Sequence, residues 1–92
     1  MQVKSIHYNK RFEDQFRALP LNIKKKALKA ERFFRENPFH PSLRLHKLQG
    51  NLKELWSISL DRKYRIIFRA LENGVVLFIS VGVHAIYEDS LN

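Results

Sequence analysis

The chain has no cysteine, three glycines and three prolines, and its longest apolar run is short. Without cysteine there is no disulfide framework, thiolate metal site or cysteine nucleophile, and the composition suits a reducing compartment. The longest apolar run, residues 75–83, is broken by Ser80 and Gly82, and the first residues lack the apolar core of a signal peptide. The sequence therefore predicts a cytoplasmic protein that does not enter a membrane.

Acidic residues are also few. Nine Asp and Glu stand against 17 Lys and Arg, which gives a net charge of +8 and a pI of about 10.1. Residues 20–53 hold nine of the basic residues and two of the acidic ones, so most of the excess lies in the middle third of the chain. An excess of this size predicts a polyanionic partner, nucleic acid before membrane. The alternative is that the basic residues only solvate a helix face.

The 92 residues suit one domain, residues 1–92, with enough hydrophobic side chains for a core. Residues 3–8 favour a strand, Asn9 can cap a first helix, and Pro20 suits the first turn of a second helix that ends before Pro38. Leu28 lies among basic residues of the second helix, which predicts an exposed apolar contact for a partner. The core stripe of that helix is predicted to be Ile23, Ala27, Ala30 and Phe34.

The second half of the chain predicts a loop over residues 37–51, with a short extended piece around 43–48, and then three strands. The strands cover residues 54–60, 63–70 and 75–82, and Asn73-Gly74 is typical of a hairpin between the last two. The elements together predict an α+β fold. In it, the N-terminal strand and a helical hairpin pack on one face of a mainly antiparallel sheet of about four strands.

Alternation of side chains assigns the strand residues to two faces. The face toward the helices is predicted to hold Trp56, Ile58, Leu60, Tyr64, Ile66, Phe68, Val75, Leu77, Ile79 and Val81. The opposite face is predicted to hold Ser57, Ser59, Arg65, Ile67, Arg69, Phe78 and Ser80, with His84 following at the strand end.

The sequence contains no glycine-rich phosphate loop, no cluster with metal-ligand spacing and no Ser-His-Asp order, so neither cofactor nor metal is expected. Arg65, His84 and the loop residues His46 and Lys47 suit RNA chemistry. Attack by an RNA 2′-hydroxyl on its own phosphate needs a base, an acid and a cation, which histidine and arginine provide. The alternatives are a cross-strand salt bridge for Arg65 and a surface position for His84.

Four short motifs carry a family resemblance. They are Leu45-His46-Lys47-Leu48-Gln49-Gly50, Trp56-Ser57-Ile58, Tyr64-Arg65-Ile66-Ile67-Phe68 and Gly82-Val83-His84-Ala85-Ile86-Tyr87. With the order of elements, they resemble the RelE/ParE toxin superfamily of type II toxin–antitoxin systems, nearest to its YafQ and YoeB branches. The resemblance implies a metal-independent mRNA interferase that cuts mRNA in the A site of the 70S ribosome. It also implies an acidic cognate antitoxin, whose complex with the toxin binds operator DNA.

The resemblance also implies roles for single residues. Arg65 matches the arginine that contacts the scissile phosphate, and His84 the histidine that acts as general acid or base. His46 matches the loop histidine of the YafQ branch and is the candidate base, with a structural loop histidine as the alternative. Tyr87 lies near a C-terminal aromatic residue that stacks on a base in some relatives, with packing of the C-terminal tail as the alternative. Further RNA contacts are expected from Lys47, Lys53, Arg62 and Lys63, with solvated surface charges as the alternative.

Two departures from the family pattern leave other functions open. Ser42 stands where YoeB-like members have a glutamate base, and Ala85 stands where many relatives have aspartate. One rival is a ParE-like inhibitor of DNA gyrase, which the pair Arg65 and His84 disfavours. The other is a non-enzymatic relative that only binds its antitoxin and nucleic acid.

Overall fold

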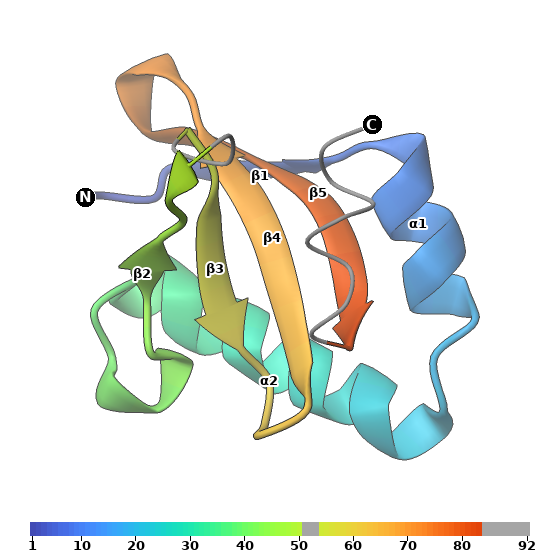
Figure 1. Cartoon of the computed structure of the whole chain (residues 1–92). Coiled ribbons are helices and arrows are strands. Elements are labelled where there is room, and N and C mark those ends of the chain that lie inside the picture. Colours follow the sequence, from blue (N-terminus) through green and yellow to red (C-terminus); the bar gives the residue numbers. More distant parts are fainter. Residues whose placement is uncertain (51–53, 84–92) are drawn as a thin grey trace.

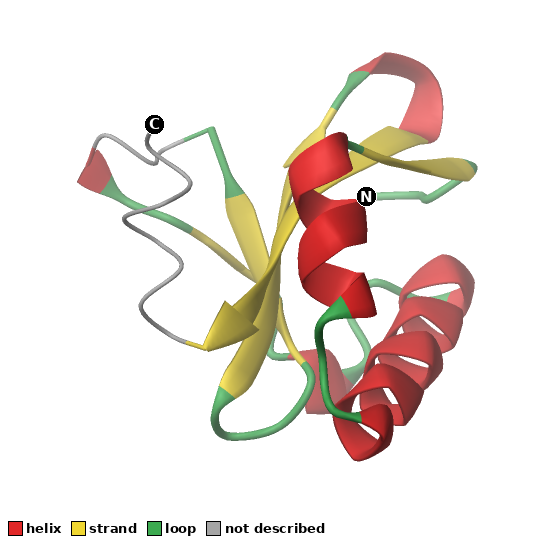
Figure 2. Cartoon of the chain, turned by 90° about the vertical axis from the view of Figure 1, so that its right-hand side faces the viewer, coloured by secondary structure: helices red, strands yellow, loops and turns green. Residues whose placement is uncertain are grey.

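The structure is a computed structural model and describes residues 1–50 and 54–83. In this part of the chain, two helices pack on one face of a five-stranded, mostly antiparallel sheet, so the α+β prediction is confirmed (Figures 1 and 2). The elements in chain order are β1 (Ser5–Tyr8), α1 (Lys10–Arg17), α2 (Leu21–Glu36), the 3-10 turn η1 (Pro41–Leu43), β2 (His46–Lys47), β3 (Trp56–Ser59), β4 (Tyr64–Ala70), the 3-10 turn η3 (Glu72–Gly74) and β5 (Val75–Val83). Among the described residues, no helix has the length and apolar character needed to cross a membrane.

Both helices begin where the sequence predicts. The side chain of Asn9 caps α1 by accepting a hydrogen bond from the backbone N–H of Phe12 at 2.8 Å. Pro20 immediately precedes α2, and Asn37 ends it before Pro38. The predicted core stripe of α2 is buried over its whole length, at Ile23, Ala27, Ala30 and Phe34.

The sheet has the strand order β1-β5-β4-β3-β2. β1 runs parallel to β5, and the other neighbouring pairs are antiparallel. The sheet has one strand more than the four or so that the sequence predicts. The additional strand is β2, because residues 46 and 47 of the predicted loop pair with β3 at the edge of the sheet. The short extended piece predicted around residues 43–48 contains this strand, but two residues are too few for a periodicity that would assign it to the sheet.

The main core lies between α2 and the sheet. The rings of Phe34, Phe68 and Phe78 meet there, with centroids 4.9 to 6.2 Å apart, and each side chain is at most 1% exposed. Ile58 and Ile66 lie in the same cluster. The faces predicted for β3 and β4 are therefore confirmed at these positions.

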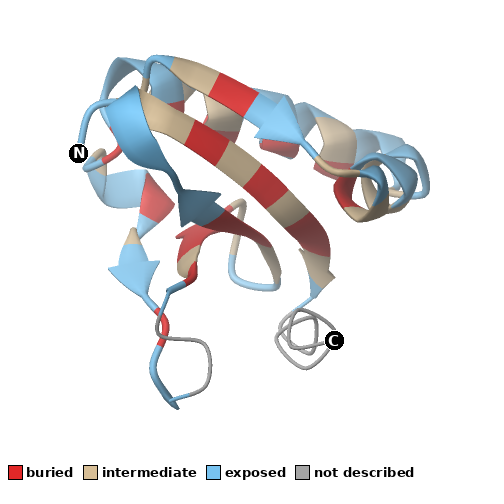
Figure 3. Ribbon diagram, turned by 90° about the horizontal axis from the view of Figure 1, so that it is seen from above, coloured by how far each residue is buried: buried red, intermediate tan, exposed pale blue. Residues whose placement is uncertain are grey.

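The predicted face is wrong for the first part of β5. Alternation assigned Val75, Leu77 and Ile79 to the helices and Phe78 to the opposite face, whereas the core contains Val76 and Phe78. Buried and half-buried positions alternate along the strand (Figure 3). A β-bulge causes the difference. Ile67 and Phe68 are neighbours on β4, but their partners on β5 are Ser80 and Phe78, so Ile79 is an extra residue. The alternation reverses at this point, and beyond it the prediction holds again.

Glycine at position 74 is required by the contact between residues 2–4, which precede β1, and the turn before β5. Gly74 has a φ of +75°, and a Cβ atom there would lie 2.8 Å from Cγ of Lys4 and 3.1 Å from the backbone oxygen of Gln2. Its carbonyl also accepts a hydrogen bond from Lys4 N–H at 2.8 Å. Gly50 has a similar φ of +68°, with no atom within 4 Å of such a Cβ.

We therefore expect Gly74→Ala to lower the free energy of unfolding more than Gly50→Ala. Alanine in the left-handed region costs about 1 to 2 kcal/mol at either site, and only position 74 adds a clash with backbone. Urea unfolding measures the difference in free energy of unfolding between the two variants, provided that their m-values are equal. Equal losses would contradict the predicted role of the contact with residues 2–4.

Candidate active site

The candidate site lies on the sheet face turned away from α1 and α2, here called the distal face. In the ladders, His46 pairs with Ser57, and Ser59 pairs with Arg65, which in turn pairs with Gly82. Directly paired residues direct their side chains to the same face, and so do residues two apart on a strand. The distal face consequently carries His46, Ser57, Ser59, Arg65, Ile67 and Ser80.

Arg65 occupies the polar end of the distal face. Its side chain is half-buried, and Nη1 donates a hydrogen bond to Oγ of Ser59 at 2.6 Å. Its Nε is buried and has no hydrogen-bond partner within the described part of the chain. Among residues 1–50 and 54–83, none of the ion pairs includes Arg65, so the alternative of a cross-strand salt bridge is not seen there. The guanidinium is thus oriented by a neutral hydroxyl and, in the described part of the chain, has no carboxylate partner.

His46 is exposed on β2, and its ring is oriented by the preceding turn. Nδ1 lies 3.1 Å from the carbonyl oxygen of Arg44. Because a carbonyl only accepts, the neutral ring carries its hydrogen on Nδ1 and has its lone pair on Nε2. Arg44 closes η1 in the left-handed conformation, with a φ of +47°, which sets the direction of this carbonyl. His46 is therefore arranged to accept a proton at Nε2.

The structure brings Arg65 and His46 to one face but leaves a gap between them. They are two strands and two residues apart, which corresponds to about 12 Å between their Cα atoms, with Ser57 and Ser59 of β3 in between. Oγ of Ser57 is buried, and none of the described residues forms a hydrogen bond with it. Sequence alternation predicts the shared face, but nothing in the sequence predicts the bond from Arg65 to Ser59.

Lys47 points away from this face. It follows His46 on the same strand, so its side chain points to the opposite face. Its Nζ lies 5.9 Å from the ring centroid of Trp56, which packs against the main core. Its predicted RNA contact is thus separate from the pair Arg65 and His46. The predicted positions Lys53, His84 and Tyr87 lie outside the described residues.

Arg62 and Lys63 are exposed on the turn that leads into β4 and Arg65. Asp61 holds this turn, because its Oδ1 accepts hydrogen bonds from the backbone N–H groups of Lys63 and Tyr64 at 2.8 and 2.7 Å. Its Oδ2 forms an ion pair with Lys26 of α2 at 2.9 Å. Burial acts to raise the pKa of the Asp61 carboxyl, but Lys26 and the two N–H groups outweigh it and hold this pKa at about 2.

A groove between α1 and α2 lies on the other side of the sheet. It has a volume of about 410 Å³ and an apolar floor that includes Phe12, Phe16 and Ala27. Leu28, predicted to be exposed, is 57% exposed and lines this groove. Within the described residues, no three His, Asp or Glu side chains gather in a way that could hold a metal ion.

Residues 5–84 match the family model described as the RelE-like toxin HigB of type II toxin–antitoxin systems. No curated protein sequence matches the chain. Among solved structures, the YoeB/ParE toxin from Agrobacterium tumefaciens is similar with a TM-score of 0.75 and 16% identity, over 88% of this chain and 99% of that one.

Two further solved structures have similar folds. The archaeal RelE–RelB complex from Pyrococcus horikoshii gives a TM-score of 0.69 at 17% identity, over 90% of this chain and 96% of that one. YafQ from Escherichia coli gives 0.66 at 19% identity, over 94% and 98%. At these identities the likeness concerns the fold.

The charge of Asp61 should contribute to stability in a defined pH window. Its pKa falls from 3.8 in the unfolded chain to about 2 in the folded one. The stabilisation is therefore complete above about pH 4 and is lost as the pH falls toward 2. We expect Asp61→Asn, which retains an acceptor for the turn, to cost about 1 to 2 kcal/mol at pH 7 and progressively less below pH 4.

Urea unfolding of wild type and variant between pH 2 and 7 measures this difference. Asp14→Asn is the matched control, because the ion pairs of Asp14 with Lys10 and Arg17 are solvent-exposed. Its effect should be smaller. If the free energy of unfolding lost in Asp61→Asn does not change with pH, the charge of Asp61 plays no part in stability.

Proposed function

The chain belongs to the HigB-like family of RelE-like toxins of type II toxin–antitoxin systems, and on this premise we propose that it is a ribosome-dependent endoribonuclease that cuts mRNA in the ribosomal A site and so inhibits translation. The observation that carries the proposal is Arg65 on the distal face. It is half-buried, is oriented by Ser59, and has no carboxylate partner among the described residues. An arginine arranged in this way is suited to a phosphodiester.

The proposed reaction is attack of a 2′-hydroxyl of the RNA on the adjacent phosphorus. The bond from phosphorus to O2′ forms and the bond to O5′ breaks, which leaves a 2′,3′-cyclic phosphate and a 5′-hydroxyl. Negative charge grows on the phosphate oxygens along this path. Arg65 stabilises that charge through the N–H groups that Ser59 leaves free.

Two proton transfers complete the reaction. His46 takes the proton of the 2′-hydroxyl at Nε2, the nitrogen that its contact with Arg44 leaves with a lone pair. His84 gives a proton to the departing O5′, a role that rests on the family resemblance. Its place in the chain supports the assignment, because Gly82, two residues earlier, lies opposite Arg65.

Basic residues around the site supply the contacts to RNA. Arg62 and Lys63 are exposed on the turn that leads into the strand of Arg65, and they bind flanking phosphates. Lys53 and Tyr87 are assigned similar contacts by the resemblance. A domain of this size offers few surfaces that could align a substrate by themselves, so the ribosome positions the mRNA.

The proposed partner is a cognate antitoxin that occupies the groove between α1 and α2. The similar archaeal RelE is in complex with RelB. An amphipathic segment with acidic residues would place apolar side chains against Phe12, Phe16 and Leu28 and its charges near Lys24. The toxin–antitoxin complex would then bind operator DNA, with Leu28 as the central apolar contact of the toxin.

Mapping of mRNA ends in a translating extract tests the activity. Wild-type protein should cut mRNA on ribosomes and leave naked mRNA intact. Arg65→Lys should lose most of the cleavage rate while it binds ribosomes nearly as well, because the charge is retained and the planar fork is lost. His46→Gln and His84→Gln should each lower the rate roughly 10²- to 10⁴-fold.

Lys4→Arg is the control for protein preparation and folding, because Lys4 lies beside β1, the edge strand opposite β2. Cleavage near the wild-type rate in all three site variants would overturn the assignment of the site. A wild-type protein that leaves mRNA intact on ribosomes would overturn the endoribonuclease function. Inhibition of DNA gyrase, or antitoxin binding alone, would then identify which rival function applies.

The antitoxin contact has a separate test. We expect Leu28→Asp to weaken binding of the cognate antitoxin by at least tenfold, because it places a charge in an apolar contact. Leu71→Asp is the matched control, since Leu71 is 47% exposed on the turn between β4 and β5, at the other end of the sheet (Figure 1). Calorimetric titration measures both affinities, and equal affinities would place the interface elsewhere.

A further inference from the structure

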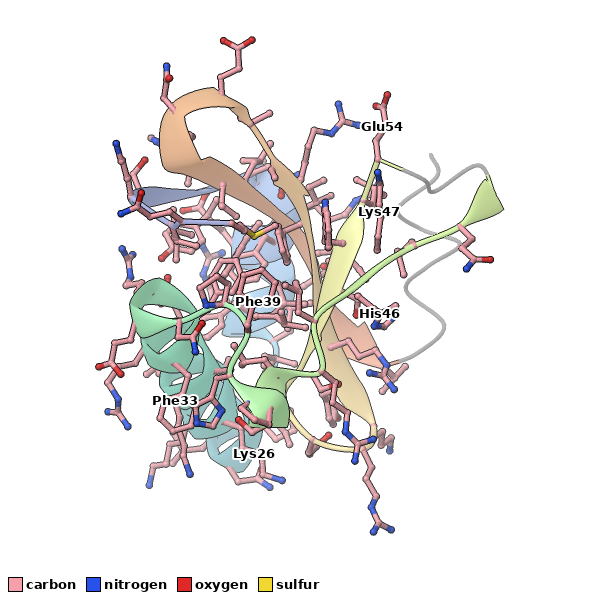
Figure 4. All side chains as sticks on the ribbon, turned by 90° about the vertical axis from the view of Figure 1, so that its left-hand side faces the viewer. Lys26, Phe33, Phe39, His46, Lys47 and Glu54 are labelled. Atoms are coloured by element: carbon pink, nitrogen blue, oxygen red, sulfur yellow. The ribbon has the colours of Figure 1, made fainter. Side chains whose placement is uncertain are left out.

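Helix α2 has a third face whose charged side chains neither the core nor the groove uses, and Phe33 at its edge also packs against the core. Lys25, Lys29, Arg32 and Phe33 lie along it, at spacings of three, four and eight residues that bring them to one side of a helix. Just after the helix, the ring of His40 stacks on Phe33, and Phe39 directly precedes His40 in the chain (Figure 4). We call the surface formed by these six residues the α2 ridge.

The α2 ridge carries positive charge that the fold leaves unpaired. Lys25, Lys29 and Arg32 are exposed, and no ion pair among the described residues includes them. The neighbouring cations differ, because Lys26 pairs with Asp61 and Arg35 pairs with Glu31. Glu36 is the acidic residue on the same side of α2, so three cations and one acid give the ridge a net charge of +2.

Aromatic rings alternate with these cations. The rings of Phe33 and His40 stack with centroids 4.4 Å apart and planes 16° apart. Nζ of Lys29 and Cζ of Arg32 lie 5.6 and 5.8 Å from the centroid of Phe33. Lys29, Arg32, Phe33 and His40 therefore form one connected cluster.

Two turn contacts fix the aromatic end of the α2 ridge. Nδ1 of His40 accepts a hydrogen bond from the backbone N–H of Ser42 at 3.2 Å, which holds the imidazole against Phe33. The backbone N–H of Phe39 donates to Oδ1 of Asn37 at 3.0 Å, and the Phe39 ring is 61% exposed. Phe39 therefore presents an exposed apolar ring directly before His40, whose ring stacks on Phe33.

We infer that the α2 ridge binds unpaired RNA at a second site, with phosphates on Lys25, Lys29 and Arg32 and a base stacked on Phe39. Proteins that bind single-stranded nucleic acid combine two features: cations placed along its phosphate backbone and exposed aromatic rings that stack on its bases. An acidic peptide would use the cations and leave Phe39 in water. Paired RNA offers phosphates but no free base face.

This inference rests on the proposed function and extends it. The α2 ridge and the distal face lie on opposite sides of the sheet, so they contact different nucleotides (Figure 2). The RNA on the ridge is therefore ribosomal RNA or a distant part of the mRNA. It anchors the toxin while Arg65 engages the phosphate that is cut.

Fluorescence anisotropy with a 2′-O-methyl oligouridine, which cannot be cut, tests binding by the whole protein. The double variant Lys25→Gln/Lys29→Gln should lower the slope of log K against log salt by about 1.4, or 0.7 for each phosphate contact. Phe39→Ala should weaken binding roughly tenfold, and Phe39→Trp should restore it. Lys10→Gln/Arg17→Gln removes the same charge from α1 and should leave most of the slope unchanged.

Sedimentation with ribosomes separates the two sources of RNA. Loss of binding to vacant ribosomes in the ridge variants indicates ribosomal RNA, and loss only on mRNA-loaded ribosomes indicates mRNA. The inference is overturned if the ridge variants bind the oligonucleotide as well as the α1 control does. It is also overturned if the ridge variants lose affinity for the antitoxin while their affinity for RNA is unchanged. If wild type binds RNA through the ridge but never cuts it, the inference stands and the endonuclease function falls.

Discussion

The contact of Phe34 with Phe68 and Phe78 determines the geometry of the rest of the molecule. These three rings meet between α2 and the two central strands and are essentially inaccessible to solvent. Loss of one buried phenylalanine costs about 3 to 5 kcal/mol, a large part of the 5 to 15 kcal/mol that stabilises a typical domain. Because strand side chains alternate, Phe68 toward α2 directs Arg65 to the distal face. A slip of one residue would lose the core and misplace the arginine together.

Sequence reasoning succeeded where a pattern is local and failed where it depends on pairing. The stripe from Ile23 to Phe34 and the cap at Asn9 were predictable because each depends on residues within one helix. Every residue from Val75 to Ile79 is apolar, so alternation alone could not decide which of them face the core. The bulge at Ile79 follows from the ladder with β4, and the parallel pairing of β1 with β5 joins segments about 70 residues apart.

The same distinction applies to the candidate site. The face of Arg65 followed from alternation on a strand with clear periodicity, and its contact with Ser59 required the register of β3. The orientation of His46 depends on Arg44, whose left-handed conformation is one that few residues other than glycine and asparagine adopt. No rule based on residue type would predict arginine there, so the lone pair on Nε2 could only be found from the structure.

Helix α2 also shows how one element serves three surfaces. Its core stripe packs on the sheet, Leu28 lines the groove, and Lys29, the next residue, belongs to the α2 ridge. The excess of positive charge destabilises an isolated chain through repulsion, so it is best explained by partners that neutralise it. The groove and the ridge lie on two sides of a helix about 10 Å wide, a distance close to the Debye length of about 8 Å at physiological salt. If the proposed antitoxin places an acidic segment in the groove, that segment would weaken the field at the ridge and so oppose the inferred RNA binding without covering these cations.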